Sequence, residues 1–178
     1  MRFVFLGLSI TSSWGNGHAT TYRGLVRELS RRGHEVLFLE RDAPWYAEDR
    51  DLAAPPWGTT RLYSTLEELR EQWTPVVRRA DVVVVGSFVP DGVDVARWTL
   101  EEARGVVAFY DLDTPVTLAK LARGETEYLS PELIPGFDLY LSFTGGPALD
   151  QLEREWGAPC ARAPRLGRPR GPLPRPGG

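Results

Sequence analysis

The sequence predicts a three-layer α/β domain with a mostly parallel sheet of about six strands. Short apolar runs bounded by turns alternate along the chain with segments of helical period, which is the pattern of repeated strand–helix–strand units. The clearest run, Asp81 to Gly86 (DVVVVG), is an uninterrupted β-branched stretch typical of a strand covered on both faces. At 178 residues and 42% hydrophobic, the chain is long enough for one substantial core.

Six segments are predicted as strands because each is short, largely apolar and followed by turn residues. They are Arg2 to Leu8, Glu35 to Leu39, Thr60 to Tyr63, Asp81 to Gly86, Val106 to Tyr110 and Leu139 to Ser142. In an open parallel sheet of this Rossmann-like kind, ligands bind beyond the carboxyl ends of the strands. We therefore expect the functional residues in the loops that follow the strands.

Five segments have helical spacing or helix-start signals. They are His18 to Arg32, Ser64 towards Trp73, Asp94 to Arg104, Pro115 to Arg123 and Pro147 to Trp156. In the second of these, Ser64 and Glu67 have the spacing of a capping box. Thr74 and Pro75 resemble a fresh N-cap and a first-turn proline, so we expect a kink or a restart there.

Residues 158–178 differ in composition from the rest of the chain. They are rich in proline, glycine and arginine and show no apolar periodicity, which predicts a disordered tail after a folded domain of residues 1–157. GC-rich codons read in a wrong frame give this composition, and Lys120 is the single lysine among 21 basic residues. We therefore favour a truncation or frameshift near Ala158 over a natural basic tail.

The composition also bounds the function. Without the tail, 24 acidic residues face 16 basic ones, which argues against a nucleic-acid partner. One cysteine and two histidines leave little for a structural metal site and favour a reducing compartment, so we expect a cytoplasmic protein that needs no metal. No segment approaches the roughly 20 apolar residues of a membrane span.

The loop after the first strand reads SSWGNGH. Gly15, Asn16 and Gly17 would let the backbone approach a ligand or adopt a positive φ, although an ordinary turn has the same composition. His18 would begin the next helix, where the helix dipole disfavours the imidazolium and leaves a neutral ring able to accept a proton. A capping or packing role is the alternative for His18, whereas His34 is expected at the opposite edge as a structural residue.

Two aspartates follow the fifth strand. We expect Asp111 or Asp113 to orient a ligand hydroxyl or to pair with His18, while Asp113 or Thr114 caps the following helix. After the sixth strand comes a second loop of small residues that suits a phosphate or a neighbouring domain, unless it is only a turn. It consists of Thr144, Gly145 and Gly146.

Aromatic side chains fall in the loops predicted at this same edge. They are Trp14, Trp45, Tyr46 and Phe88. Flat rings of this kind stack on sugars and line binding clefts, although each one singly could equally pack its own loop. Together with Asp111, Asp113 and Glu40 as holders of a diol, they favour a carbohydrate-like ligand.

Four stretches in this order resemble the N-terminal half of the CgeB-like (spore-maturation type) glycosyltransferases: GLSITSSWGNGHATTYRGLVRELSRRGHEVLFLERDAPWYAEDRDL, VGSFVPDGV, YDLDTPVTLAKL and DLYLSFTGG. The resemblance covers roughly residues 1–157. It implies the N-terminal, acceptor-side domain of a GT-B fold, an enzyme that transfers a sugar from a UDP- or GDP-sugar to an acceptor without an obligatory metal. The residues that carry over are Gly15 to His18, Asp111, Asp113 and Thr144 to Gly146. In a complete enzyme, we expect His18 or Asp111 to be the catalytic residue that activates the acceptor hydroxyl.

The resemblance stops where the chain would enter the C-terminal, donor-binding domain of a GT-B enzyme. It therefore implies a sugar or glycan acceptor as partner, and little or no transfer by this chain alone. Two alternatives remain. One is a fragment of an NAD(P)- or FAD-dependent oxidoreductase with Glu40 on the ribose, although the first turn lacks G-x-G-x-x-G spacing. The other is a non-catalytic sugar-binding module.

Overall fold

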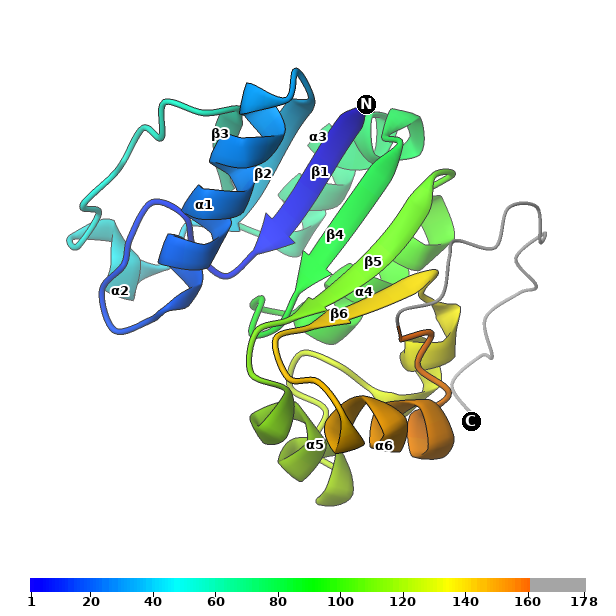
Figure 1. The fold of residues 1–178 in the computed structure, drawn as a ribbon. Helices are drawn as coiled ribbons and strands as arrows, with labels where there is room; N and C mark the ends of the chain where they lie inside the picture. Colours follow the sequence, from blue (N-terminus) through cyan, green and yellow to red (C-terminus); the bar gives the residue numbers. More distant parts are fainter. Residues whose placement is uncertain (161–178) are drawn as a thin grey trace.

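The computed structural model describes residues 1–160, which form one α/β domain around a six-stranded parallel sheet (Figure 1). The strand order is β3-β2-β1-β4-β5-β6. The chain adds strands on one side of β1 up to β3 and then on the other side from β4 onward, so the strand order reverses between β1 and β4. The strands are β1 (Arg2–Gly7), β2 (Glu35–Arg41), β3 (Thr59–Tyr63), β4 (Val82–Gly86), β5 (Val106–Asp111) and β6 (Leu139–Ser142). This confirms the predicted fold class.

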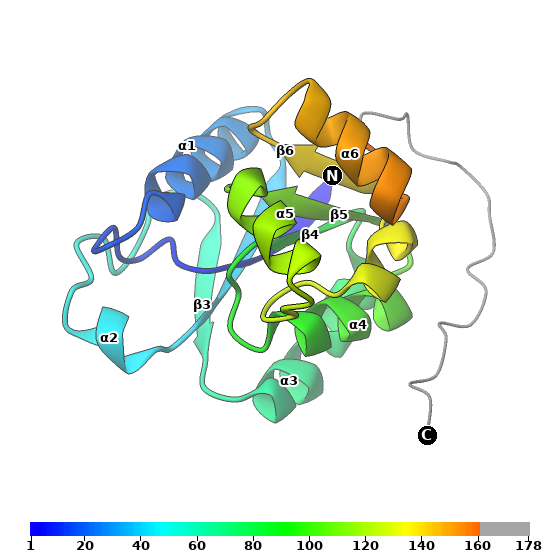
Figure 2. The same cartoon turned by 90° about the horizontal axis from the view of Figure 1, so that it is seen from below.

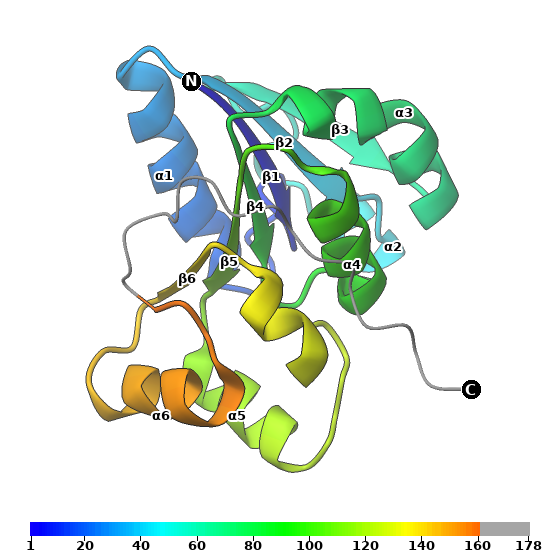
Figure 3. The same ribbon diagram turned by 90° about the vertical axis from the view of Figure 1, so that its right-hand side faces the viewer.

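Helices cover both faces of the sheet. Helix α1 (His18–Arg31) lies on one face, and α3 (Leu66–Arg79) and α4 (Gly92–Glu102) lie on the other (Figure 3). Beyond the carboxyl ends of the strands lie α5 (Thr114–Ala122) and the short α2 (Pro44–Ala47), as the view from below shows (Figure 2). The remaining helices are the 3₁₀ helix η1 (Pro131–Gly136) and α6 (Pro147–Trp156).

The strand β4 shows how the sequence pattern produces the layers. Val83 and Val85 face the core under α3 and α4, whereas Val84 faces the smaller core under α1 together with Phe5 and Phe38. All five side chains are almost completely buried. Because neighbouring side chains of a strand point to opposite faces, a strand buried on both sides must be apolar throughout.

Helix α1 approaches the sheet closely at the point where the strand order reverses. Gly86 ends β4, and a Cβ atom at that position would lie 1.8 Å from the hydroxyl oxygen of Tyr22. The absence of a side chain at Gly86 therefore makes room for the buried Tyr22. Because His18 lies one turn before Tyr22, this packing brings His18 to the carboxyl edge of the sheet.

The predicted capping box of α3 and the predicted restart at Pro75 are corrected by the structure. The N-cap is Thr65, whose hydroxyl accepts a hydrogen bond from Glu68 N–H, and Glu68 in turn accepts one from Ser64 N–H. The box is thus shifted by one residue from Ser64 and Glu67. The helix also continues through Pro75 without a restart. Beside Pro75, the hydroxyl of Thr74 donates to the carbonyl of Arg70 and accepts from the Trp98 indole, which joins this part of α3 to α4.

Other boundaries differ by a few residues. Helix α4 begins at Gly92 and not at Asp94, and neither α2 nor η1 was predicted because each is too short to show a period. Ala158 and Cys160 are buried, and Cys160 pairs in parallel with Tyr140 of β6, so packing continues past the predicted boundary at residue 157. The rest of the predicted tail, 161–178, lies outside the described residues.

Candidate functional site

The loop after β1 is built around the buried carboxylate of Glu40, which is 0% exposed. Glu40 accepts hydrogen bonds from the backbone N–H groups of Ile10 (2.6 Å) and Thr11 (3.0 Å) and from the hydroxyls of Ser9 (3.1 Å) and Thr11 (2.6 Å). Both carboxylate oxygens are therefore committed to the protein itself. The predicted role of Glu40 in holding a ligand diol is wrong, and the ribose site of the oxidoreductase alternative loses its acid.

A second anchor fixes the outer part of this loop. The guanidinium of Arg23 forms a two-pronged ion pair with Asp51, and its Nε donates to the carbonyl of Ile10 (2.9 Å). Asp51 also accepts from the backbone N–H and the hydroxyl of Ser13. The hydrogen bonds from Arg23 and Ser13 hold the pKa of Asp51 well below its usual range. The loop is thus held at two points, by Glu40 inside and by the Arg23–Asp51 pair in its outer part.

The tip of the loop projects outward. Gly15 adopts a φ of +65°, as its predicted flexibility allows, whereas Gly17 has an ordinary φ of −86° as the N-cap of α1. The side chain of Asn16 accepts from Ala19 N–H and donates to the carbonyl of Trp14, so it joins the tip to the helix. Trp14 itself is 57% exposed. A ligand at this edge would meet an indole ring presented by a fixed loop.

His18 occupies the first position of α1 and lies at the centre of the edge. Its ring packs edge-on against Phe88, with the ring centroids 5.4 Å apart and the planes at 86°. Burial lowers the pKa of the imidazole below its ordinary value, and the nearby charge of Asp113 offsets part of that effect. The predicted neutral ring therefore has burial as its main physical cause. A neutral imidazole can accept a proton at neutral pH.

The two aspartates after β5 have different environments. Strand β5 ends at Asp111, so alternation does not place both side chains on one side. Asp113 is exposed, and its charge acts to raise the pKa of His18. Its side chain makes no capping hydrogen bond to α5. Asp111 is 0% exposed and accepts from Thr117 (2.9 Å), Tyr140 (2.7 Å) and the N–H of Asp113 (3.2 Å). The carboxylate of Asp111 is thus enclosed by hydrogen-bond donors of the protein and is not open to an acceptor hydroxyl, as its predicted catalytic role would require. Asp113 is the aspartate that faces outward.

Asp111 gives a pH-dependent prediction. Burial raises its pKa, and the hydroxyls of Tyr140 and Thr117 offset part of that rise. Because the folded state binds this proton more readily than the unfolded state, wild-type protein gains stability relative to Asp111→Asn as the pH falls through the raised pKa to about 3.9. We expect the free energy of unfolding of the variant to match or exceed that of the wild type near neutral pH and to fall behind in acid.

Urea unfolding at a series of pH values between about 7 and about 4 measures this difference. Asp113→Asn is the matched control, because it removes an exposed carboxylate at the same edge and should not reproduce the pH-dependent crossover. A constant free-energy difference between wild type and Asp111→Asn over the whole range contradicts the prediction.

The predicted aromatic residues divide into two groups. Trp45 on α2 is 56% exposed, and its ring packs edge-on against the buried Tyr46, with the ring centroids 6.2 Å apart. Phe88 instead turns inward and packs against Tyr128, with the ring centroids 4.5 Å apart. Trp14 and Trp45 are therefore the predicted aromatics with exposed faces.

The loop Thr144 to Gly146 takes a tight turn before α6. The N–H of Thr144 donates to the hydroxyl of Ser142 (2.8 Å), and Gly146 has a φ of +62°, which favours glycine. Next to this loop, Phe143 is 64% exposed and packs at a tilt against Tyr110, with the ring centroids 5.9 Å apart. Sequence reasoning missed Phe143, although its position directly after β6 places it at the same edge.

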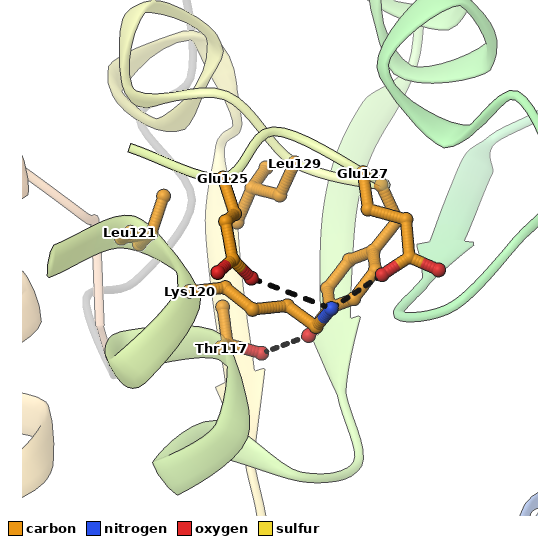
Figure 4. A pocket seen from close by; sticks show the side chains of 7 residues that line it. Thr117, Lys120, Leu121, Glu125, Glu127 and Leu129 are labelled. Atoms are coloured by element: carbon orange, nitrogen blue, oxygen red, sulfur yellow. Dashed lines mark hydrogen bonds and ion pairs between the residues drawn. The ribbon is translucent and has the colours of Figure 1, made fainter. Parts of the chain in front are cut away.

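A small hollow beside α5 lies apart from these residues (Figure 4). It holds about 150 Å³ of empty space, including open solvent, and Lys120 crosses it to reach Glu127 at 2.5 Å and Glu125 at 3.9 Å. The cation is thus paired with two carboxylates. None of the predicted site residues lines this hollow.

Residues 1–160 show neither a cluster of metal ligands nor a helix that could span a membrane. Within that range, no three His, Cys, Asp or Glu side chains gather where they could hold a metal ion. Among the helices of the described part, none combines the length and apolar character needed to cross a bilayer. Comparison with known proteins adds no assignment, because no protein-family model and no curated protein matches the chain.

Proposed function

We propose that residues 1–157 are the acceptor-side domain of a CgeB-like GT-B glycosyltransferase, which moves a sugar from a UDP- or GDP-sugar to an acceptor hydroxyl. The observation that carries the proposal is the half-buried, neutral His18 at the reversal point of the strand order, with exposed Asp113 beside it. The exposed indoles of Trp14 and Trp45 support a sugar acceptor at the same edge.

In the proposed reaction, His18 accepts the proton of the acceptor hydroxyl as that oxygen bonds to the anomeric carbon of the donor sugar. The bond between the sugar and the diphosphate breaks, and the nucleoside diphosphate leaves with the electron pair. Asp113 offsets the charge of the imidazolium that forms, because it already raises the proton affinity of His18. Asp111, enclosed by hydroxyl donors, has the supporting role of fixing the loop that carries Asp113.

The leaving diphosphate also needs stabilisation, which in a GT-B enzyme comes from the donor-binding domain. The proposal gives the loop Thr144 to Gly146 the role of facing that C-terminal domain in a complete enzyme. Phe143, Trp14 and Trp45 support such a contact, because exposed aromatic side chains collect at this edge. The same proposal includes a cytoplasmic location, where nucleotide sugars are substrates and the single cysteine stays reduced.

Titration of the purified chain tests the binding side of the proposal. In NMR spectra, free acceptor sugars should shift the signals of His18, Trp14 and Trp45, whereas UDP- and GDP-sugars should bind weakly and no sugar should be transferred. Binding of a nicotinamide cofactor at this edge would revive the oxidoreductase alternative. Sugar binding that persists unchanged in a fully reconstituted protein without any transfer would favour the non-catalytic module.

The coding DNA tests whether a donor-binding domain is encoded after this one, and it needs no protein. Translation of the sequence after Ala158 in the other two frames should give a second Rossmann-like domain. A stop codon or unrelated sequence in every frame would contradict the truncation. Robust sugar transfer by the 178-residue chain would contradict the need for a donor-binding domain.

A further inference from the structure

The backbone at Phe88 has an unusual conformation. Phe88 follows the end of β4 and has a φ of +62°, and Asp91 is the other non-glycine residue of the described range with a positive φ. Aspartate tolerates this region, whereas a bulky aromatic side chain makes it sterically unfavourable. Glycine would adopt this conformation freely, so we look to the contacts of the phenyl ring for the reason that phenylalanine is present.

Neighbouring contacts hold Phe88 in place. The preceding Ser87 is fully buried, and its N–H donates to the carbonyl of Tyr110 (2.9 Å) while its hydroxyl accepts from Leu112 N–H (3.1 Å). These bonds tie the loop after β4 to the loop after β5. On the inner side, the Phe88 ring packs on the buried Tyr128. The ring therefore has little freedom to move.

The outer side of the Phe88 ring contacts His18. The Nδ1 atom of His18 is buried and has no hydrogen-bond partner within residues 1–160. Of the charged groups on the elements around it, Asp113 at the start of α5 is the one that acts on the imidazole. On α1 itself, the next residue on the same face is Tyr22, which is uncharged. Packing, and not a hydrogen bond to Nδ1, must orient this ring.

We propose that Phe88 is a positioning residue, whose strained backbone holds its ring against His18 and thereby fixes the orientation of the imidazole and shields one side of it from water. This replaces the sequence-based expectation that Phe88 stacks on a ligand. The catalytic meaning of the contact rests on the proposed function. The contact itself does not, because it concerns two side chains of this chain alone.

Histidine NMR on the purified chain tests the proposal. The chain has two histidines, so the ring protons of His18 can be assigned with His18→Gln, and His34 at the opposite edge serves as an internal reference. In wild-type protein, the ring protons of His18 and Phe88 should show a nuclear Overhauser effect. In Phe88→Ala, the titration midpoint of His18 should move upward towards its ordinary value, because burial is the main cause that lowers the pKa.

Three further variants sharpen the result. Phe88→Tyr keeps the ring and should leave the titration midpoint of His18 unchanged. Phe143→Ala removes another aromatic ring of the same edge, but that ring packs against Tyr110, so this variant should also leave the midpoint unchanged. If Phe88→Ala does not fold, Phe88→Gly removes the same ring while relieving the backbone. An unchanged His18 midpoint in the folded ring-less variant, or no Overhauser effect in wild-type protein, overturns the proposal.

The outcome is separable from that of the proposed function. If the midpoint shifts in a protein that never transfers sugar, Phe88 still sets the pKa of His18. Only the proposed glycosyltransferase function would then fail. In a reconstituted active enzyme, Phe88→Ala should shift the pH profile of turnover in the same direction as the NMR midpoint. Lower turnover with an unshifted profile would contradict the positioning role.

Discussion

Replacing Glu40 with glutamine should lower the free energy of unfolding by about 3 kcal/mol, a large part of the stability of a domain this size. The two oxygens of Glu40 accept from two backbone N–H groups and two hydroxyls in a fully buried site. The N–H groups of Ile10 and Thr11 share one carboxylate oxygen and the two hydroxyls share the other, so in Glu40→Gln the amide oxygen can face the N–H groups while its NH₂ faces the hydroxyls. The hydroxyls must then accept where they now donate, and every bond loses the negative charge that makes a hydrogen bond to a carboxylate roughly twice as strong as a neutral one.

Urea denaturation followed by circular dichroism measures this loss, and hydrogen exchange locates it. The amides of Ile10 and Thr11 should exchange faster in the variant. Glu48→Gln is the matched control, because Glu48 is exposed and the same substitution there should change the free energy by less than about 0.5 kcal/mol. Equal effects of the two substitutions would show that the bonds to Glu40 contribute little.

The second large effect concerns His18. In a complete enzyme that joins this domain to a donor-binding domain, His18→Ala should reduce kcat by a factor of about 10² to 10⁴, the usual contribution of a general base. The fold should change little by comparison, because the half-exposed imidazole makes no hydrogen bond through Nδ1. Steady-state kinetics and thermal unfolding of the same preparation measure the two effects.

His34→Ala is the control for that experiment. His34 lies at the amino edge of the sheet beside Phe3, so its loss should leave kcat unchanged. If His18→Ala loses stability in proportion to activity, the histidine has only a structural role. If His18→Ala keeps full turnover, another group accepts the proton and the proposed mechanism fails.

The sequence alone predicted the sheet because its evidence is local. A run such as Val82 to Val85 specifies a strand buried on both faces without reference to any other segment. The restart predicted at Pro75 does not occur, and the hydrogen bond beside it, from the Trp98 indole to Thr74, is a tertiary contact between residues 24 positions apart. Local helix signals cannot show whether packing will carry a helix past a proline.

The candidate site was predictable only in outline. Topology alone places His18, Asp111 and Asp113 at one edge, but it does not say which side chains turn inward. Asp111 is buried because Tyr140, from a strand that follows it by 29 residues, closes over it. The carboxylate of Glu40 accepts its hydrogen bonds from the loop around Ile10, 30 residues earlier in the chain. Both facts depend on contacts distant in sequence, which spacing does not encode.

The short pairing between Cys160 and Tyr140 also bears on solubility. The N–H of Tyr140 donates to the carbonyl of Pro159 (3.3 Å), so residues 159 and 160 occupy part of the open edge of β6. An uncovered strand edge is a template on which other chains can pair and aggregate. By covering this edge, residues 159 and 160 oppose association of the sheet with other chains. A version of the protein that ends at residue 157 should therefore precipitate more readily than one that includes them.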